Sequence, residues 1–386
     1  MWRSILRIGI NALYLLPGKV GGTETYIRNL VKSLIELDSN NTYYIFINKE
    51  SAGTFEQLTS RIHIVLCPVR ASNRPARILW EQFILPFQIL RNKIDVLLSA
   101  GMTAPFFRLS RSILVIYDLQ HINQPQNFSR FHLFFLKTII YLSAKTANGV
   151  ITISEHVKRD IVRHYKISPE RIMVGYLAVD HDLFFPLSGG DTVSVRKKYD
   201  LPERYILYAA ALLPHKNHER LLQAFKEIKD EMAGRKLVFT GAWEKGYDKI
   251  VQMVSALGLQ KDVILLGWLP FEDIPAVYRG AEIFVYPTLH EGFGLPVLEA
   301  MASGVPVICS RIEPLTEVAG DAAFFIDPYD HSDIARGISG VLKDKSLRMK
   351  LIEKGRLKAK EFTWGNTALN TLSFLTSHAS GNNIEA

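Results

Sequence analysis

Strand signals and helix signals alternate along almost the whole chain, and this alternation limits the possible folds more than any other feature. Short β-rich runs, several of them continuously apolar, are followed by segments in which apolar residues recur at helical spacing. Continuously apolar runs are typical of strands buried on both faces of a parallel sheet. The sequence therefore predicts right-handed crossovers and an α/β fold with doubly wound sheets.

The alternation occurs as two sets, one in each half of the chain. The length of 386 residues also fits two domains. The expected helices include one with an apolar stripe from Tyr26 to Ile35 and one from Leu221 to Ile228. We therefore expect two Rossmann-like domains that face a cleft. The expected strands are residues 5–10, 43–47, 62–66, 113–117 and 150–154 in the first set, and 205–210, 237–240, 263–266, 283–286, 305–309 and 323–326 in the second.

The boundary between the domains is expected within residues 180–200. Pro186 and the sequence SGGD at 188–191 mark a change to the composition of a linker. The prediction is an N-terminal domain over 1–183, a C-terminal domain over 184–365, and a C-terminal helix with a frayed polar tail over 366–386.

Composition excludes several classes of protein. Hydrophobic residues make up 48% and charged residues 22%, which is globular rather than disordered composition. No stretch approaches the roughly 20 apolar residues of a spanning helix, and Arg3 and Arg7 make the N-terminus a poor signal peptide. Cys67 and Cys309 are too few for a disulfide framework or a cysteine zinc site. We expect a cytoplasmic protein, either soluble or peripheral at the inner membrane face.

The positive charge is concentrated in the first half of the chain. Residues 1–183 hold 22 Lys and Arg against 13 Asp and Glu, whereas the remainder holds 24 against 25. A basic half of this kind is typical of a protein with a surface for anionic lipid or for a phosphorylated acceptor. The alternative is a solvated surface with some excess charge. Nucleic acid is not an expected partner, because no zinc-finger spacing, aromatic-basic RNA signature or helix-turn-helix is recognisable.

The segment 128–144 combines aromatic and basic residues in roughly helical order, among them Arg130, Phe131, Phe134 and Lys137. This pattern fits a helix that lies in a bilayer interface. A buried helix of the N-terminal domain is the favoured interpretation, because apolar residues circle most of the helix.

The segment YPTLHEGFGLPVLEAMA at 286–302 carries the strongest chemical signal. A strand is expected to end at Pro287, a glycine-rich loop follows, and a helix begins near Pro296. The loop amides of Phe293, Gly294 and Leu295 are then placed to bind phosphate oxygens at the start of a helix.

Two glutamates flank this cradle of amides. Glu291 precedes the loop, and Glu299 lies inside the following helix, eight residues later. Their different positions predict different tasks, and packing alone rarely produces such a pattern.

Three other loops hold candidate contacts, each with a plain structural alternative. Gly21 and Gly22 open the first helix, where they form a ligand loop or a tight turn. Lys216, in the sequence PHKN, is a compact cation near the start of a helix, where it could bind a diphosphate. The alternative is that Lys216 is an exposed lysine of a loop. Asp118 and His121 follow a strand at its C-terminal end, where ligands bind in such sheets, or belong to an ordinary surface loop.

Together these motifs resemble those of the retaining glycosyltransferases of family 4, which have the GT-B fold. The run from Glu291 to Ala302 resembles the E-x7-E signature of the family. Further segments agree in the family order, and the DLQH segment is similar to mannosyltransferases. These segments are GGTE at 21–24, RILWEQ at 77–82, DLQH at 118–121, residues 208–217 and EPLTEVAGDAA at 313–323.

The resemblance implies a nucleotide-diphosphate sugar held mainly by the C-terminal domain and an acceptor held mainly by the N-terminal domain. Glu291 would bond the sugar hydroxyls, and Glu299 would bind the ribose. Lys216 and the amides at 293–295 would neutralise the leaving diphosphate, so that charge is stabilised where it develops. The family needs no metal, and no other cofactor is expected.

The sequence departs from the family pattern at positions near the expected chemistry. Tyr117 stands before Asp118 where the family often has a histidine linked to catalysis, so His121 either substitutes or the role is lost. Ala210 and Ala211 stand where the family commonly has Gly followed by Arg or Thr, so we expect one contact to the diphosphate to be missing. The candidate catalytic residues are thus Glu291, Lys216, Asp118 and His121. The sequence DHD at 180–182 spells the metal motif of another glycosyltransferase fold, but we interpret it as the linker.

The expected function is a retaining glycosyltransferase that extends a bacterial surface glycan. GDP-mannose is the favoured donor, with UDP- and dTDP-sugars open, and the expected acceptor is a glycan or a polyprenyl-linked glycan. The alternatives are a non-catalytic sugar-nucleotide or glycan-binding subunit and a nucleotide-sugar epimerase on the same fold. A dinucleotide-dependent oxidoreductase ranks last, because the glycine fingerprint with its acidic partner is missing.

Overall fold

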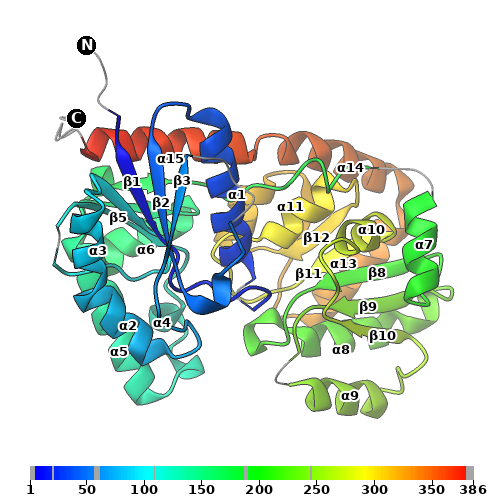
Figure 1. Cartoon of the computed structure of the whole chain (residues 1–386). Coiled ribbons are helices and arrows are strands. Elements are labelled where there is room, and N and C mark those ends of the chain that lie inside the picture. Colours follow the sequence, from blue (N-terminus) through cyan, green and yellow to red (C-terminus); the bar gives the residue numbers. More distant parts are fainter. Residues whose placement is uncertain are drawn as a thin grey trace. The chain divides into compact units, whose positions relative to one another are not determined.

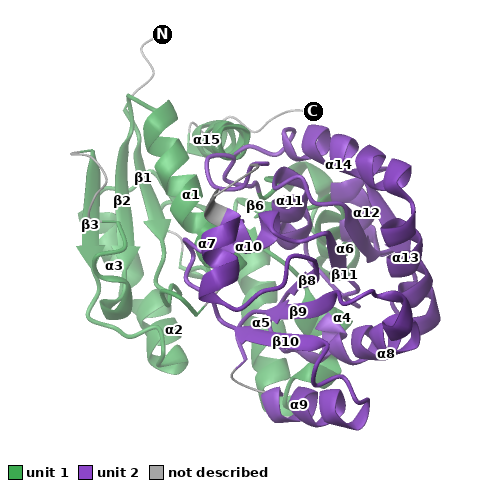
Figure 2. Cartoon of the chain, turned by 90° about the vertical axis from the view of Figure 1, so that its right-hand side faces the viewer, with its two compact units in different colours: residues 1–177, 364–386 green, residues 178–363 purple. Residues whose placement is uncertain are grey.

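The computed structural model describes residues 5–19, 21–55, 61–107, 109–186, 190–243 and 246–379. The chain divides into unit 1, residues 1–177 and 364–386, and unit 2, residues 178–363 (Figure 2). The structure therefore places the boundary somewhat before the expected one after residue 183, and it assigns the last helix to unit 1 rather than to a separate segment. Part of the SGGD segment and the tail beyond residue 379 lie outside the described residues.

Unit 1 is built on a seven-stranded parallel sheet in the order β3-β2-β1-β4-β5-β6-β7 (Figure 1). The strand order reverses between β1 and β4. This reversal is the topological switch point of the sheet, where the loops that follow neighbouring strands run in opposite directions. Its strands are β1 (Arg7–Asn11), β2 (Thr42–Ile47), β3 (Ile62–Leu66), β4 (Val96–Ser99), β5 (Arg111–Ile116), β6 (Gly149–Thr152) and β7 (Ile172–Val174). Its α-helices in the described residues are α1 (Gly22–Leu37), α2 (Arg74–Phe83), α3 (Leu85–Arg91), α4 (Gln120–Asn123), α5 (Arg130–Thr146), α6 (Glu155–Tyr165) and α15 (Trp364–Ala379).

The C-terminal helix α15 completes unit 1 by packing on both α1 and the sheet. Trp364 lies edge-on to Tyr26 of α1, with ring centroids 6.2 Å apart. Further along α15, Phe374 fills the space over Gly149 of β6, where a Cβ atom would stand 2.7 Å from the ring. A side chain at position 149 would therefore push α15 away, so this glycine is required by packing.

Unit 2 holds a six-stranded parallel sheet in the order β10-β9-β8-β11-β12-β13. The order again reverses, here between β8 and β11, so both units are doubly wound and the predicted α/β fold class is confirmed. The strands are β8 (Tyr205–Ala209), β9 (Lys236–Thr240), β10 (Val263–Gly267), β11 (Ile283–Tyr286), β12 (Val307–Ser310) and β13 (Ala323–Ile326). The described α-helices are α7 (Gly190–Lys198), α8 (His218–Ile228), α9 (Tyr247–Ala256), α10 (Ile274–Arg279), α11 (Leu295–Ala302), α12 (Glu313–Ala319), α13 (His331–Lys343) and α14 (Lys345–Ala359).

The expected strands are present with shifts of one or two residues at their ends, and β4 and β7 were not predicted. The segment 128–144 forms α5, as its pattern indicated, but the favoured interpretation of a buried helix is wrong for its first half. Phe131 and Phe134 are 84% and 71% exposed, whereas Ile139 and Ile140 are buried. In the part of the chain that the structure describes, no helix has the length and apolar character needed to cross a membrane.

Candidate active site

The loops after β8 and β11 are tied together at the point where the strand order of unit 2 reverses. The carbonyl of His215 accepts hydrogen bonds from the Leu289 amide at 2.7 Å and the Thr288 hydroxyl at 3.0 Å. The amide of Asn217 donates to the Pro287 carbonyl at 2.9 Å. Ligands bind outside the carboxyl ends of strands at such a switch point, so these bonds fix the walls of a candidate site.

Lys216, Tyr286 and Glu291 form a hydrogen-bonded cluster between these two loops. The ammonium of Lys216 pairs directly with Glu291 Oε1. The Tyr286 hydroxyl donates to the same oxygen at 2.6 Å and accepts from Lys216 Nζ at 3.1 Å. The structure thus brings together the cation and one carboxylate of the sequence prediction, which are 75 residues apart in the chain.

The cluster is partly buried, and its electrostatics keep the carboxylate ionised. The side chains of Lys216 and Glu291 are only 14% and 13% exposed. Burial by itself would raise the pKa of Glu291, but the adjacent ammonium and the hydrogen bonds from Lys216 and Tyr286 hold this pKa below its usual value. A charged acceptor with fixed geometry is suited to bind hydroxyl groups, and the cation beside it is suited to bind phosphate oxygens.

The glycine-rich loop that follows Glu291 leads directly into α11. Gly294 has φ +101°, and a Cβ atom there would stand 2.3 Å from Leu315 Cδ2. Both the backbone conformation and the packing therefore require glycine at this position. The buried Phe293 packs on Phe362, with ring centroids 5.8 Å apart, and α11 has no side-chain cap at its N-terminus. The positive end of the helix dipole at Leu295 therefore suits an anion.

Glu299 lies one turn into α11 and is held by a different neighbour. Its carboxyl group is hydrogen bonded to the Tyr278 hydroxyl. Burial raises the pKa of Glu299 to about 7, with the Tyr278 bond acting in the opposite direction. The two glutamates of the motif thus occupy different environments, one ion-paired and one desolvated, and their different tasks stay a prediction.

The raised pKa of Glu299 predicts a dependence of stability on pH in the nucleotide-free protein. Between the ordinary value of 4.5 and about 7 the folded state binds more protons than the unfolded state, so the free energy of unfolding falls as pH rises through this window. Glu299→Gln should not show this loss. We therefore expect its free energy of unfolding to rise relative to that of wild type by on the order of 1–3 kcal/mol as the pH increases from 5 to 8. Denaturant unfolding of both proteins at the two pH values measures this difference, and parallel pH profiles would contradict the shift.

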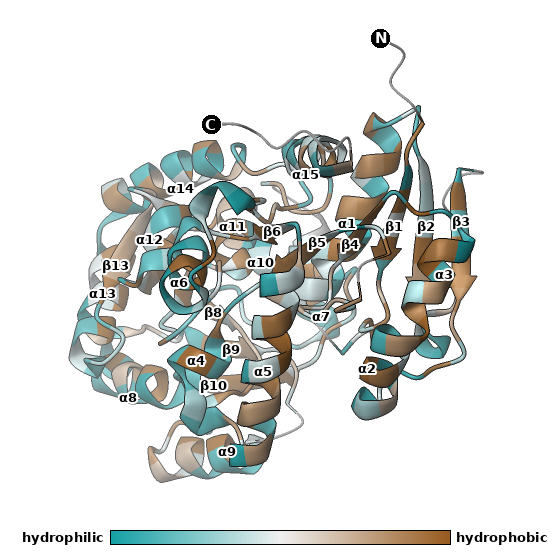
Figure 3. Cartoon of the chain, turned by 90° about the vertical axis from the view of Figure 1, so that its left-hand side faces the viewer, coloured by the Kyte–Doolittle hydropathy of each residue, from teal (hydrophilic) through white to brown (hydrophobic). Residues whose placement is uncertain are grey.

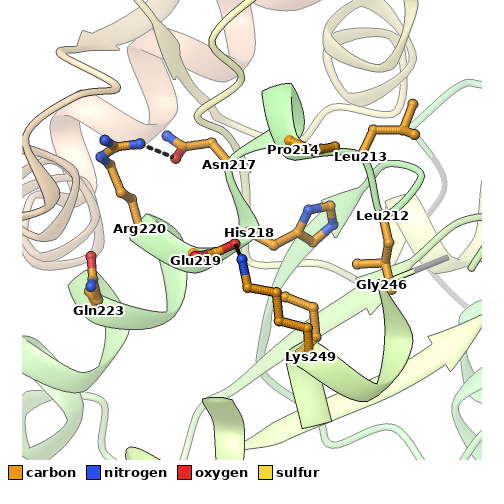
Figure 4. Close-up of a pocket in the computed structure, with 11 residues that line it drawn as sticks. Leu212, Leu213, Pro214, Asn217, His218, Glu219, Arg220, Gln223, Gly246 and Lys249 are labelled. Atoms are coloured by element: carbon orange, nitrogen blue, oxygen red, sulfur yellow. Dashed lines mark hydrogen bonds and ion pairs between the residues drawn. The ribbon is translucent and has the colours of Figure 1, made fainter. Parts of the chain in front are cut away.

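A pocket of about 560 Å³ adjoins the Lys216 loop on the side of α8 and α9 (Figure 4). Its polar side carries an ion pair between Glu219 and Lys249 at 2.5 Å. Arg220 Nη1 donates to Asn217 Oδ1 at 3.0 Å on the same rim. The lining includes neither Lys216 nor Glu291, so the pocket borders the cluster without containing it.

The loop after β8 begins with two alanines, Ala210 and Ala211, which bring no side-chain hydrogen-bond donor to it. The Ala210 amide is bonded to the Thr240 carbonyl at 2.8 Å, and Gly241 lies against the Ala210 backbone so closely that a Cβ atom would meet its oxygen at 2.2 Å. A methyl group at 211 has no hydrogen-bonding atom. Lys216 stays the predicted cationic contact of this loop.

In unit 1, Gly21 and Gly22 form the start of α1, as the sequence predicted. Gly21 has φ +55° and ψ −130°, a conformation that favours glycine, and it caps the helix without a side-chain bond. Glu24 of the first turn accepts from the Gly18 amide at 2.7 Å. The loop thus presents the positive end of a sixteen-residue helix after β1, at the switch point of its own sheet.

His121 and Tyr117 are buried, and Asp118 lies between them at the end of β5. His121 is 2% exposed, and its Nε2 lies 2.8 Å from the Tyr165 hydroxyl. Burial and, to a smaller extent, Lys137 lower the pKa of His121 to about 4, so the ring is neutral near pH 7. The Tyr117 hydroxyl donates to the Ala100 carbonyl at 2.8 Å. His121 is thus a neutral, buried side chain of unit 1, and whether it substitutes for the family histidine stays a prediction.

Asp118 is partly exposed and has a local structural role. Its Oδ1 accepts from the Gln120 amide at 3.0 Å and so closes the turn into α4. Its predicted role toward substrate stays a prediction. The structure assigns Asp118, His121 and the glycine loop to unit 1 and the remaining candidates to unit 2.

The DHD sequence at 180–182 forms a tight turn. Asp180 Oδ1 accepts from the Asp182 amide at 3.0 Å, and the Asp180 carbonyl accepts from the Phe184 amide at 2.8 Å. His181 Nε2 lies 3.2 Å from the Phe362 carbonyl. Within the described ranges, no group of three or more His, Cys, Asp and Glu side chains is arranged to hold a metal ion.

Three tyrosines contribute to the site without having been predicted. Tyr286 joins Lys216 to Glu291, Tyr278 holds Glu299, and the Tyr208 hydroxyl donates to the Lys216 carbonyl. Tyr286 and Tyr208 lie at or near the C-terminal ends of β11 and β8. A polar side chain at the end of an expected strand is therefore the sequence signal that could have identified them. Tyr278 lies on α10, and nothing in the sequence connects it to Glu299.

Comparison with known proteins shows the family of this chain. Residues 20–183 match the family described as Glycosyltransferase Family 4, and residues 192–358 match Glycosyl transferases group 1. The O-antigen chain mannosyltransferase B of Escherichia coli is 34% identical over 270 residues, which cover 69% of this chain and 70% of that protein. The chain belongs to glycosyltransferase family 4. It is thus a retaining glycosyltransferase of a typically metal-independent family, as the resemblance of its motifs implied.

Other relatives agree over shorter stretches or in fold alone. The serotype-specific mannosyltransferase WbdA of Escherichia coli is 30% identical over 58% of this chain, which is only 28% of WbdA. The crystal structure of HepE from Anabaena in complex with UDP and glucose matches 96% of this chain and 100% of that chain, with a TM-score of 0.76 and 18% identity. The likeness to HepE shows that this glycosyltransferase has the GT-B fold.

Proposed function

We propose that this glycosyltransferase moves mannose from GDP-mannose to a glycan or polyprenyl-linked glycan in the synthesis of a bacterial surface polysaccharide. The observation that carries the choice of sugar is the 34% identity to an O-antigen chain mannosyltransferase. The DLQH segment at 118–121, similar to mannosyltransferases, supports the same choice.

The cluster in unit 2 supplies the groups that this reaction needs. Lys216 and the N-terminus of α11 neutralise the charge that develops on the leaving diphosphate. Glu291, kept ionised by Lys216 and Tyr286, holds the sugar hydroxyls, and Glu299 holds the ribose. When the donor binds, its phosphate oxygens replace Glu291 as the partner of Lys216, so the resting ion pair keeps the site ready at little cost in reorganisation.

Retention of configuration then needs no strong side-chain base. The bond between the anomeric carbon and the phosphate oxygen breaks, and the acceptor oxygen attacks from the same face of the sugar. The proton of the acceptor hydroxyl passes to the leaving phosphate, which completes the balance of the step. The burial of His121 is compatible with this route, because the route does not use an imidazole.

The test is thermal unfolding with GDP, UDP, ADP or dTDP, each alone. A ligand present at about 100 times its dissociation constant stabilises the folded state by about 2.7 kcal/mol, which shifts the melting temperature by several degrees. We expect a shift with GDP, followed by turnover of GDP-mannose with glycan acceptors. A shift with UDP or dTDP alone would overturn the choice of donor and leave the family assignment untouched.

A further inference from the structure

The outward face of α5 is apolar. Phe131, Phe134 and Phe135 follow the spacing i, i+3, i+4 and therefore lie on one side of the helix, with exposures of 84%, 71% and 37%. Ile139 and Ile140, about one turn further along the helix, are buried. Figure 3 shows the resulting apolar colour along the visible turns of α5. A helix that is apolar on its solvent side as well as its core side reverses the usual surface pattern and marks an interaction surface.

The helices α2 and α3 and the loop after β4 continue this surface. Leu79, Phe83, Phe87 and Leu90 are each between 57% and 67% exposed. Phe107, in the loop after β4, is 67% exposed. These exposures show that the apolar character extends over three neighbouring segments of unit 1.

Hydrogen bonds through Ala104 connect α2 to α5. The Gln82 amide of α2 donates to the Ala104 carbonyl at 3.0 Å, and the Ala104 amide donates to the Ser143 hydroxyl of α5 at 3.1 Å. Ile78 of α2 shares a buried core with Ile139 of α5. We call the surface of α2, α3, residues 104–107 and α5 the aromatic face. It holds six of the seven exposed phenylalanines of the described chain, namely Phe83, Phe87, Phe107, Phe131, Phe134 and Phe135.

The exposed charges of the aromatic face all have the same sign. Arg74 and Arg91 lie at the two ends of the α2–α3 pair, and Arg130 and Lys137 lie on α5, which contains no acidic residue. The one carboxylate of α2, Glu81, is 1% exposed and accepts from the Asn11 amide in the interior. Part of the excess positive charge of the first half of the sequence therefore lies on this face.

We infer that the aromatic face docks on an anionic lipid bilayer. Aromatic rings with guanidinium and ammonium groups beside them match the boundary between acyl chains and anionic headgroups. A second copy of this chain is a poor occupant, because a self-complementary contact would oppose cations with cations. The inference goes beyond the proposed function, since it holds whichever sugar is transferred.

The test is cosedimentation of the full chain with vesicles of phosphatidylcholine alone or of phosphatidylcholine with 30% phosphatidylglycerol. We expect binding to the anionic vesicles that weakens at high salt and little binding to the neutral ones. Phe131→Gln with Phe134→Gln is expected to lower anionic binding at least tenfold. Arg130→Gln with Lys137→Gln is expected to lower it by about fivefold for each charge removed. Both pairs of positions are exposed, so the melting temperature of each double variant should match wild type.

The matched control is Met349→Gln with Leu357→Gln on α14 of unit 2. These side chains are 58% and 61% exposed, and their helix is also rich in basic residues. Unchanged binding in this control supports the aromatic face as the docking surface. Absence of binding by wild type, equal binding by the Phe131 and Phe134 variant, or loss of binding in the control alone would each overturn the inference. So would a wild-type dimer that this α5 variant converts to monomer without any change in vesicle binding.

Discussion

Glu291→Ala is expected to lower the rate of sugar transfer on the order of a thousandfold while the protein stays folded. The carboxylate is ionised and is held by two donors, Lys216 and Tyr286. The variant loses the contact to the sugar, but it frees Lys216 from its internal partner. We therefore expect nucleotide diphosphate to bind at least as tightly as in wild type. Turnover with the donor found in the nucleotide panel and titration with the free nucleotide measure the two effects separately.

The control for this variant is Glu353→Ala on α14, an exposed carboxylate of the same unit. Its transfer rate and melting temperature should equal those of wild type. Transfer by Glu291→Ala within tenfold of wild type would remove Glu291 from the site. Loss of nucleotide binding by the same variant would show instead that the carboxylate serves the fold of the loop.

The fold was largely readable from the sequence because parallel strands buried on both faces leave continuous apolar runs. The strand β7 was missed because its three residues are too few to distinguish a strand from an apolar loop. The strand β4 was also missed, although at four residues it is as long as β6 and β11, which were predicted. The orientation of α5 was also missed, since its composition is apolar all round and only the neighbouring elements decide which side is covered.

The candidate site was predictable within one loop and much less so between loops. The glycine-rich loop and both glutamates lie within a few residues of one another, so their proximity follows from the chain itself. The contact of Lys216 with Glu291 depends on β8 and β11 being neighbours in the sheet, which only the topology establishes. His121 shows another limit of prediction from sequence. A histidine at a strand end has the same sequence signal whether its side chain is exposed or is buried against Tyr165, as it is here.

Lys216→Met is expected to weaken both the fold of unit 2 and the binding of nucleotide diphosphate. The change leaves the carboxylate of Glu291, with its side chain 13% exposed, without its cation. Breaking a buried pair in this way costs about 2–4 kcal/mol, which lowers the melting temperature by several degrees. The loss of a charged contact to the diphosphate should weaken binding about 10- to 100-fold. Calorimetric melting and nucleotide titration measure the two effects.

The double variant Lys216→Met with Glu291→Gln separates these effects. Its neutral pair removes the unpaired charge, so most of the lost stability should return, whereas the weak nucleotide binding should remain. Lys343→Met, which breaks the exposed pair with Glu231, is the control and should leave the melting temperature essentially unchanged. If the double variant is no more stable than Lys216→Met, the two side chains are not coupled in the fold. If it regains nucleotide affinity, then Lys216 acts only by neutralising Glu291, and the diphosphate must be bound by the amides of α11 alone.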